Sequence, residues 1–213
     1  MAQHVKRRRP YDATKRRADA LARRTEILDA AADLFERDGF AATTVAAVAG
    51  RAGVSAETVY KNFASKAGLV RALLDRALKG EGRVPAYERS DQLRSLADPY
   101  EIVAGWSRLA TEVSPRGSPV LLLVRDAALV DAGLRPLLAD LQELRHQRMT
   151  ENAEFLRTAG HLREGITREA AADLMWSVTA PEMYELLVLQ RGWTLDQYRD
   201  YVFHTVAGLL ARR

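Results

Sequence analysis

Three polar side chains, Ser55, Thr58 and Lys61, follow one another at intervals of three residues. In an α-helix this spacing places them along one side. Hydroxyl groups donate and accept hydrogen bonds, and a lysine ammonium can bind a guanine edge or a phosphate. Together with the small Ala56, which permits close approach, these residues form a set that could read base edges in a DNA major groove.

The residues around this set predict a helix, a tight turn and a second helix. Gly53 stands where the first helix must end, and Ser55 is a good N-cap for the second. Apolar residues precede and follow the turn at helical spacing. They are Val45, Val48, Ala49, Val59 and Phe63. This order of elements is typical of a helix-turn-helix motif, whose second helix enters the major groove; an ordinary packed corner of two helices is the alternative.

Two continuous stretches, ILDAAADLFERDGF (27–40) and TTVAAVAGRAGVSAETVYKNFASKAGL (43–69), carry a closer match. They resemble the tetracycline-repressor-type (TetR) family of transcriptional regulators. The resemblance implies an all-α protein with an N-terminal head of three helices that binds DNA. It also implies a helical C-terminal domain that binds a ligand and forms the dimer.

The resemblance extends to individual phosphate contacts. In that family the residue at the place of Thr44 tends to face a phosphate, and the tyrosine at the place of Tyr60 contacts one through its hydroxyl. Lys61 stands where the family often has histidine, so its role is less defined. Lys66 combines a cation with a helix N-terminus, and both favour a phosphate. Ala67–Gly68 replaces the acid that usually follows this lysine, which we expect to loosen the start of the helix.

The N-terminal residues are strongly basic. Residues 1–24 hold nine Lys or Arg and two Asp, a net charge of +7, so the remaining chain carries −3. A basic arm on a mildly acidic body suggests an anionic polymer as partner, although a solvated tail is the alternative. We expect residues 1–20 to form a flexible arm that lies on phosphates or in a minor groove. Its candidate contacts are Arg7, Arg8, Arg9, Arg16 and Arg17.

The remaining pattern predicts an all-α chain of about nine helices. Residues 21–80 would form the DNA-binding domain, residues 81–213 the ligand-binding and dimerisation domain, and residues 80–98 the connector. A cap followed by proline at Asp98–Pro99, and again at Ser118–Pro119, predicts two helix starts. Pro181 falls within a helical pattern and predicts a kink.

One short recognition helix reads only a few base pairs, so a two-fold dimer on a palindromic double-stranded DNA site is expected. The last two helices have wide apolar faces and could form a four-helix bundle with a second copy, or simply close the core of one chain. The C-terminal domain would also hold a cavity for a small-molecule effector. For each candidate lining residue, a place in the ordinary core is the favoured alternative. By helical spacing the candidates are Trp106, Leu109, Leu122, Leu141, Met149, Trp176 and Tyr184.

Several other classes of function lack support in the sequence. The chain has no cysteine, and its four histidines are scattered, so neither a metal site nor a cofactor is predicted. No phosphate-binding glycine loop and no catalytic triad stands out, so an enzyme is not expected. No apolar run is long enough to span a bilayer. The absence of cysteine fits a reducing cytosol, so a cytoplasmic protein is expected. The main alternative is a DNA-binding protein of architectural type, without sequence preference.

Overall fold

The computed structural model describes residues 13–79 and 84–211, and these residues form an all-α fold without a β-strand. The predicted class is therefore confirmed. Ten α-helices are present in the described residues where about nine were predicted, together with a 3-10 turn, η1, and a π-helical segment, η2. In chain order the elements are α1 (Ala13–Ala42), α2 (Val45–Arg51), α3 (Ala56–Phe63), α4 (Lys66–Lys79), α5 (Ala86–Leu93), α6 (Pro99–Val130), η1 (Ala132–Leu134), α7 (Arg135–Thr158), α8 (Arg168–Val178), α9 (Pro181–Tyr184), η2 (Glu185–Gln190) and α10 (Leu195–Ala207).

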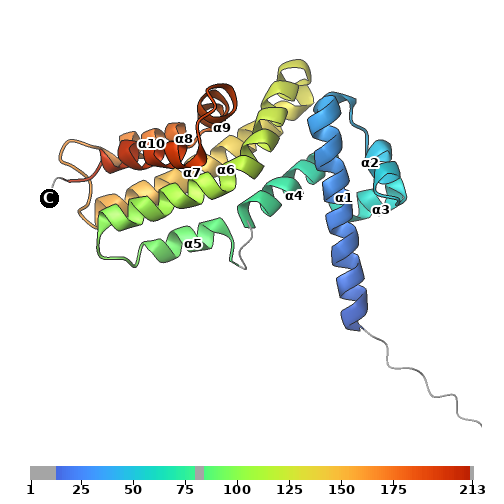
Figure 1. Cartoon of the computed structure of the whole chain (residues 1–213), viewed down its shortest axis with the longest axis horizontal. Helices are drawn as coiled ribbons and strands as arrows, with labels where there is room; N and C mark the ends of the chain where they lie inside the picture. Colours follow the sequence, from blue (N-terminus) through green and yellow to red (C-terminus); the bar gives the residue numbers. More distant parts are fainter. Residues whose placement is uncertain (1–12, 80–83, 212–213) are drawn as a thin grey trace, which may run out of the picture.

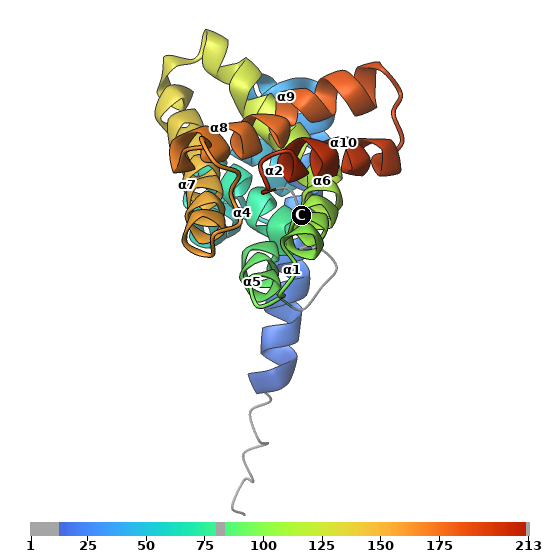
Figure 2. The same cartoon turned by 90° about the vertical axis from the view of Figure 1, so that its left-hand side faces the viewer.

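The helices form a small head and a larger body (Figure 1). Helices α1, α2 and α3 group at one end, and α5 to α10 form the body at the other, with α4 running between them. Seen from the end, the N-terminal part of α1 projects well beyond the body (Figure 2). The head therefore presents α2 and α3 away from the body.

Two clusters of buried side chains stabilise this arrangement. The first joins α1 to α4 with the end of α6 and the start of α7, where Val124 and Leu137 are buried. The second joins the first half of α6 to the end of α7 and to α8, α9 and α10. Because α6 and α7 contribute to both clusters, these two helices link the head to the body.

The structure corrects the predicted start of a helix at Ser118–Pro119. Helix α6 runs without a break from Pro99 to Val130 and contains both Pro115 and Pro119. A proline removes one backbone hydrogen bond, and packing along the whole length of α6 against head and body offsets that loss. The predicted start at Asp98–Pro99 is confirmed, since Asp98 Oδ1 accepts a hydrogen bond from Tyr100 N at 2.9 Å.

Residues 86–93 form helix α5, where the sequence predicted a connector. The amphipathic signal of this helix is weak, and tertiary contacts hold it. Trp106 Nε1 donates to the carbonyl oxygen of Ser90 at 3.2 Å, and Arg148 Nη2 donates to that of Tyr87 at 3.1 Å. At Pro181 the chain breaks rather than kinks, because α8 ends at Val178 and Pro181 begins α9.

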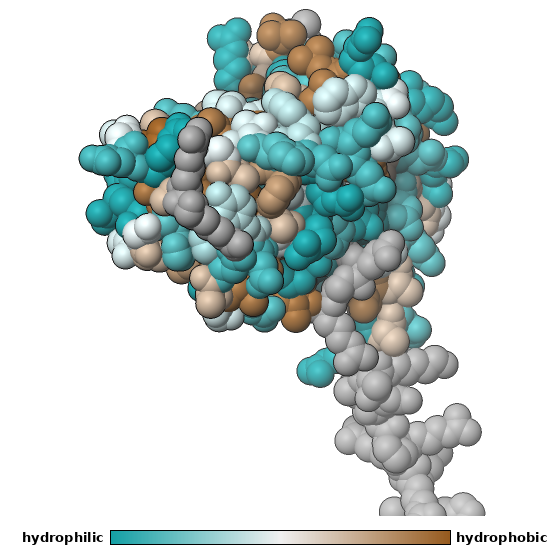
Figure 3. Space-filling view, turned by 60° about the vertical axis from the view of Figure 1, so that its left-hand side comes forward, coloured by the Kyte–Doolittle hydropathy of each residue, from teal (hydrophilic) through white to brown (hydrophobic). Residues whose placement is uncertain are grey.

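The surface is largely hydrophilic on the face shown in Figure 3, with small hydrophobic patches between charged side chains. Within the described residues, none of the helices is both long and apolar enough to cross a membrane.

Candidate nucleic-acid interface and internal cavity

The turn between α2 and α3 sets the direction of α3. Gly53 has a φ of 65°, which glycine adopts at little steric cost. Thr44 Oγ1 caps α2 by accepting a hydrogen bond from Ala47 N at 3.0 Å, and Ser55 Oγ caps α3 by accepting one from Thr58 N at 3.2 Å. The hydroxyls of Ser55 and Thr58 also bind each other at 2.9 Å. Each hydroxyl keeps capacity for one further hydrogen bond to a partner.

Helix α3 has one buried and one exposed side. Val59 and Phe63 are buried in the core of the head. Tyr60 is 53% exposed, Lys61 is exposed, and Ala56 is half-buried against the core. The exposed side of α3 is therefore polar and carries the Tyr60 hydroxyl, the Lys61 ammonium and the capping hydroxyls. The opposite side is held in the core of the head.

Arg24 of α1 holds the end of α3 in place. Its guanidinium donates to the carbonyl oxygen of Asn62 at 3.1 Å and lies 4.4 Å from the centre of the Phe63 ring. The side-chain amide of Asn62 donates in turn to the carbonyl oxygen of Thr58 at 2.8 Å. From the sequence, Arg24 was predicted only as part of the basic N-terminal charge. The residues next to it do not indicate that it binds the carbonyl group of Asn62, 38 residues away.

The structure gives Lys66 a different role from the predicted phosphate contact. Its ammonium donates to the carbonyl oxygens of Phe40 at 2.7 Å, Thr43 at 3.0 Å and Ala41 at 3.5 Å. It also lies 4.2 Å from the centre of the Phe40 ring, and burial lowers the pKa of Lys66. Lys66 thus fastens the start of α4 to the connection between α1 and α2, with its donors used inside the chain.

Gly68 lies at a close approach between α3 and α4. A Cβ atom at this position would overlap the carbonyl oxygen of Phe63, and Gly68 N donates to Ser65 Oγ at 3.0 Å. The predicted loosening of the helix start is therefore wrong. The missing side chain lets the first turn of α4 pack tightly against the end of α3.

The predicted flexible arm over residues 1–20 is helical from Ala13 onward. Residues 13–24 are rich in alanine, arginine and lysine, which have high helix propensity. Arg16 and Arg17 lie exposed in the first turns of α1. The other three predicted contacts, Arg7, Arg8 and Arg9, lie outside the described residues.

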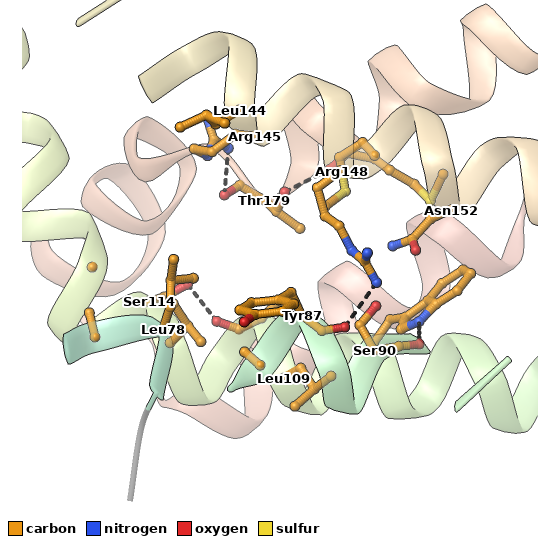
Figure 4. A pocket seen from close by; sticks show the side chains of 18 of the residues that line it. Leu78, Tyr87, Ser90, Leu109, Ser114, Leu144, Arg145, Arg148, Asn152 and Thr179 are labelled. Carbon is orange, nitrogen blue, oxygen red and sulfur yellow. Dashed lines mark hydrogen bonds between the residues drawn. The ribbon is translucent and has the colours of Figure 1, made fainter. Parts of the chain in front are cut away.

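The body contains a cavity of about 660 Å³. Its wall is mostly apolar and comes from α4 to α10 (Figure 4). Four of the predicted pocket residues line it, namely Trp106, Leu109, Leu141 and Met149. Helix α4 contributes Leu74 and Leu78, so the helix that begins at the head also forms part of the cavity wall.

Three predicted pocket residues do not line this cavity. Leu122 is buried elsewhere along α6. The Trp176 ring meets His146 edge-on at 6.0 Å, and the Tyr184 ring meets Tyr198 edge-on at 5.8 Å. Helical periodicity predicts which side of a helix faces inward, but not which inward residues border an empty space.

Polar groups of α7 also reach the cavity wall. Asn152 is buried, and its Oδ1 accepts a hydrogen bond from Arg94 Nη2 at 2.8 Å. Arg145 and Arg148 line the same cavity, and sequence reasoning missed both. Their spacing from Leu141, at four and seven residues, places them on one side of α7 and was the available signal.

Known proteins resemble this chain both in sequence and in fold. The family model described as "Bacterial regulatory proteins, tetR family" matches residues 27–73, which run from α1 into α4. YdeS of Bacillus subtilis, an uncharacterised helix-turn-helix-type transcriptional regulator, is 28% identical over 211 residues, covering 97% of this chain and 95% of YdeS. The chain thus resembles TetR-family regulators, with the family model itself matching the helix-turn-helix head.

A second TetR-type comparison is more local. YvkB of Bacillus subtilis, also an uncharacterised helix-turn-helix-type transcriptional regulator, is 39% identical over 70 residues. That match spans 33% of this chain and only 37% of YvkB, well under half of either length. The strongest sequence identity is thus confined to part of the chain.

Solved structures share the whole fold. NalD of Pseudomonas aeruginosa, described as the secondary repressor of a multidrug efflux pump, superposes with a TM-score of 0.67 at 21% identity, covering 92% of this chain and 98% of NalD. SmeT in complex with triclosan superposes with a TM-score of 0.69 at 20% identity, covering 90% of this chain and 92% of SmeT. These similarities confirm the TetR fold in head and body alike.

Proposed function

We propose that this chain is a ligand-responsive transcriptional regulator of the TetR family, most simply a repressor, that acts on DNA in the cytoplasm. The observation that carries the proposal is the exposed side of α3, where Tyr60 and Lys61 stand beside the capping hydroxyls while Val59 and Phe63 anchor the other side. Such a helix can enter a major groove and place Ser55 and Thr58 at base edges.

A homodimer on a palindromic site follows from the small size of α3. One helix of eight residues reads few base pairs, and two copies related by a two-fold axis double the readout. The candidate dimer surface is the one predicted from the last helices, now resolved as α8, α9, η2 and α10. Leu186 and Leu189 of η2 support it, because they are 48% and 56% exposed.

A small molecule in the cavity would act through α4. The cavity touches Leu74 and Leu78 of this helix, and the same helix is bound to the head through Lys66. A ligand that fits only one position of α4 would shift the equilibrium between two spacings of the paired heads. SmeT, which shares the fold, was solved in complex with the small molecule triclosan.

Selection of genomic DNA fragments on the purified full-length protein, followed by footprinting, tests the proposal. A regulator should protect one or a few palindromic sites. An architectural DNA-binding protein should bind all fragments at similar strength with a steep dependence on salt. Absence of any DNA binding would contradict both the regulator and the architectural protein, and an enzyme would then be the remaining hypothesis.

A further inference from the structure

One cation in the cavity wall lacks a carboxylate partner among the described residues. Arg145 Nη2 donates to the carbonyl oxygen of Thr179 at 3.1 Å (Figure 4). It also donates to the carbonyl oxygen of Trp176 at 3.2 Å, and Arg145 Nη1 donates to Gln142 Oε1 at 2.8 Å. All three acceptors are neutral. The hydrogen bonds orient the guanidinium at the end of α8 but leave its charge without an ion pair.

The other arginines of the wall are paired. Arg148 lies 2.6 Å from Asp91 and 2.8 Å from Glu151, and Arg71 lies 2.8 Å from Asp140. Their charges are neutralised by side chains of this protein. Arg145 differs from them in having a net positive charge to offer to a bound molecule.

The surroundings of Arg145 destabilise its positive charge. Burial lowers the pKa of Arg145, which means that its site disfavours the charged form. Glu182 acts on it only from a distance, and that carboxylate lies 3.5 Å from Arg125. Arg145 is half-buried, and a partly buried charge is stabilised when an opposite charge binds beside it.

The hydrogen-bonding balance around the cavity points the same way. In the described part of the chain, every buried side-chain polar atom without a partner is an N–H donor, and none is an acceptor. Arg148 Nε, in the cavity wall, is one of them, and Trp176 Nε1 lies on the residue whose carbonyl group binds Arg145. Two carboxylates also line the cavity, but Asp75 and Glu151 are exposed, and Glu151 is paired. The buried side-chain groups left without a partner are therefore donors, which an anion could satisfy.

We propose that the cavity binds an amphipathic anion, with an apolar body among Trp106, Leu109 and Met149 and a single carboxylate directed at Arg145. This inference rests on the proposed function, because it takes the cavity to be the effector site. It adds the chemical class of the effector. Neutral and cationic molecules of the same size should bind less well, since they leave the charge of Arg145 uncompensated.

Three probes with the same ten-carbon chain test this class: decanoate, decan-1-ol and decyltrimethylammonium. Calorimetric titration into the full-length protein at pH 7, with each probe below its micelle concentration, gives three dissociation constants. We expect decanoate to bind about tenfold or more tightly than decan-1-ol, because a hydrogen bond between two charged groups is stronger than one to a neutral hydroxyl. The cation should bind most weakly. Equal binding of acid and alcohol, or no binding of any probe, would overturn the inference.

Arg145→Gln should remove the preference for decanoate over decan-1-ol, and Arg145→Lys should retain part of it. Arg157→Gln is the matched control, because Arg157 is an exposed residue of the same helix that pairs with Glu154. A preference that survives in Arg145→Gln would contradict the assignment.

A measurement on the unmodified protein guards against misfolding of the variants. The ¹³C signal of carboxyl-labelled decanoate, followed against pH in the complex, should give a carboxyl pKa below that of free decanoate. A raised pKa would place the carboxyl group in an apolar site away from Arg145. Footprinting without any probe tests DNA binding separately, so failure of this inference leaves the proposed regulator intact, and failure of DNA binding leaves the probe result standing.

Discussion

The ammonium group of Lys66 donates to the carbonyl oxygen of Phe40 at 2.7 Å and lies 4.2 Å from the centre of the ring of the same residue. This contact joins the first residue of α4 to the end of α1. The other end of α4 reaches the cavity through Leu74 and Leu78. A single helix of 14 residues therefore connects the cavity with the helix-turn-helix head.

Lys66→Met should destabilise the protein, because three carbonyl oxygens lose a charged donor. We expect the free energy of unfolding in urea to fall by about 1–3 kcal/mol. Lys79→Met is the control, since Lys79 is exposed in the last turn of the same helix. If Lys66→Met instead weakened DNA binding without changing stability, the phosphate contact predicted from the sequence would be the better interpretation.

Gly68→Ala should disturb the packing of α3 against α4, because the new methyl group meets the carbonyl oxygen of Phe63. We expect a loss of about 1–3 kcal/mol in the free energy of unfolding, typical of overpacking. Gly50→Ala is the matched control within α2, where a Cβ atom meets nothing within 4 Å. That change should be neutral or stabilise by up to about 1 kcal/mol. Equal effects of both substitutions would show that helix propensity, and not close approach, decides the outcome.

Tyr60→Phe should weaken binding to all DNA sequences by a similar factor, about 2- to 10-fold, because one hydrogen bond to the backbone is lost. Tyr87→Phe provides the control, since Tyr87 is 51% exposed on α5, away from the head, against 53% for Tyr60. Fluorescence anisotropy with a specific and a random duplex gives both affinities. A loss confined to the specific duplex would mean that Tyr60 reads bases.

The features predicted from the sequence are those set by neighbours along the chain. The caps at Thr44, Ser55 and Asp98 follow from a hydroxyl or carboxylate that precedes a helical pattern. The roles of Lys66 and Arg145 could not be predicted, because the backbone carbonyl groups that they bind lie more than 20 residues away in the sequence. A cavity is likewise defined by the offsets between several helices, which periodicity does not contain.

Alkaline pH should destabilise the protein through Tyr198. Burial raises the pKa of Tyr198 to about 12, so the unfolded chain loses this proton first, near its ordinary value of 10. The free energy of unfolding should therefore fall as the pH rises from 10 to 12, by about 2–3 kcal/mol for two pKa units. Denaturation titrations should show a shallower fall in Tyr198→Phe and an unchanged one in Tyr60→Phe. The same slope in all three proteins would assign alkaline destabilisation to other groups.

Two charged residues introduced on η2 should disrupt the proposed dimer. Leu186 and Leu189 are 48% and 56% exposed, and a buried carboxylate pair at a two-fold interface would repel its copy. We expect the variant carrying Leu186→Glu and Leu189→Glu to sediment with the mass of one chain and to lose most of its affinity for a palindromic site. The control carries Leu96→Glu and Leu129→Glu, two other exposed leucines outside α8 to α10, and should sediment as the unmodified protein does. If the η2 variant remained dimeric, the interface would lie on a different surface and the last helices would serve only the core of each chain.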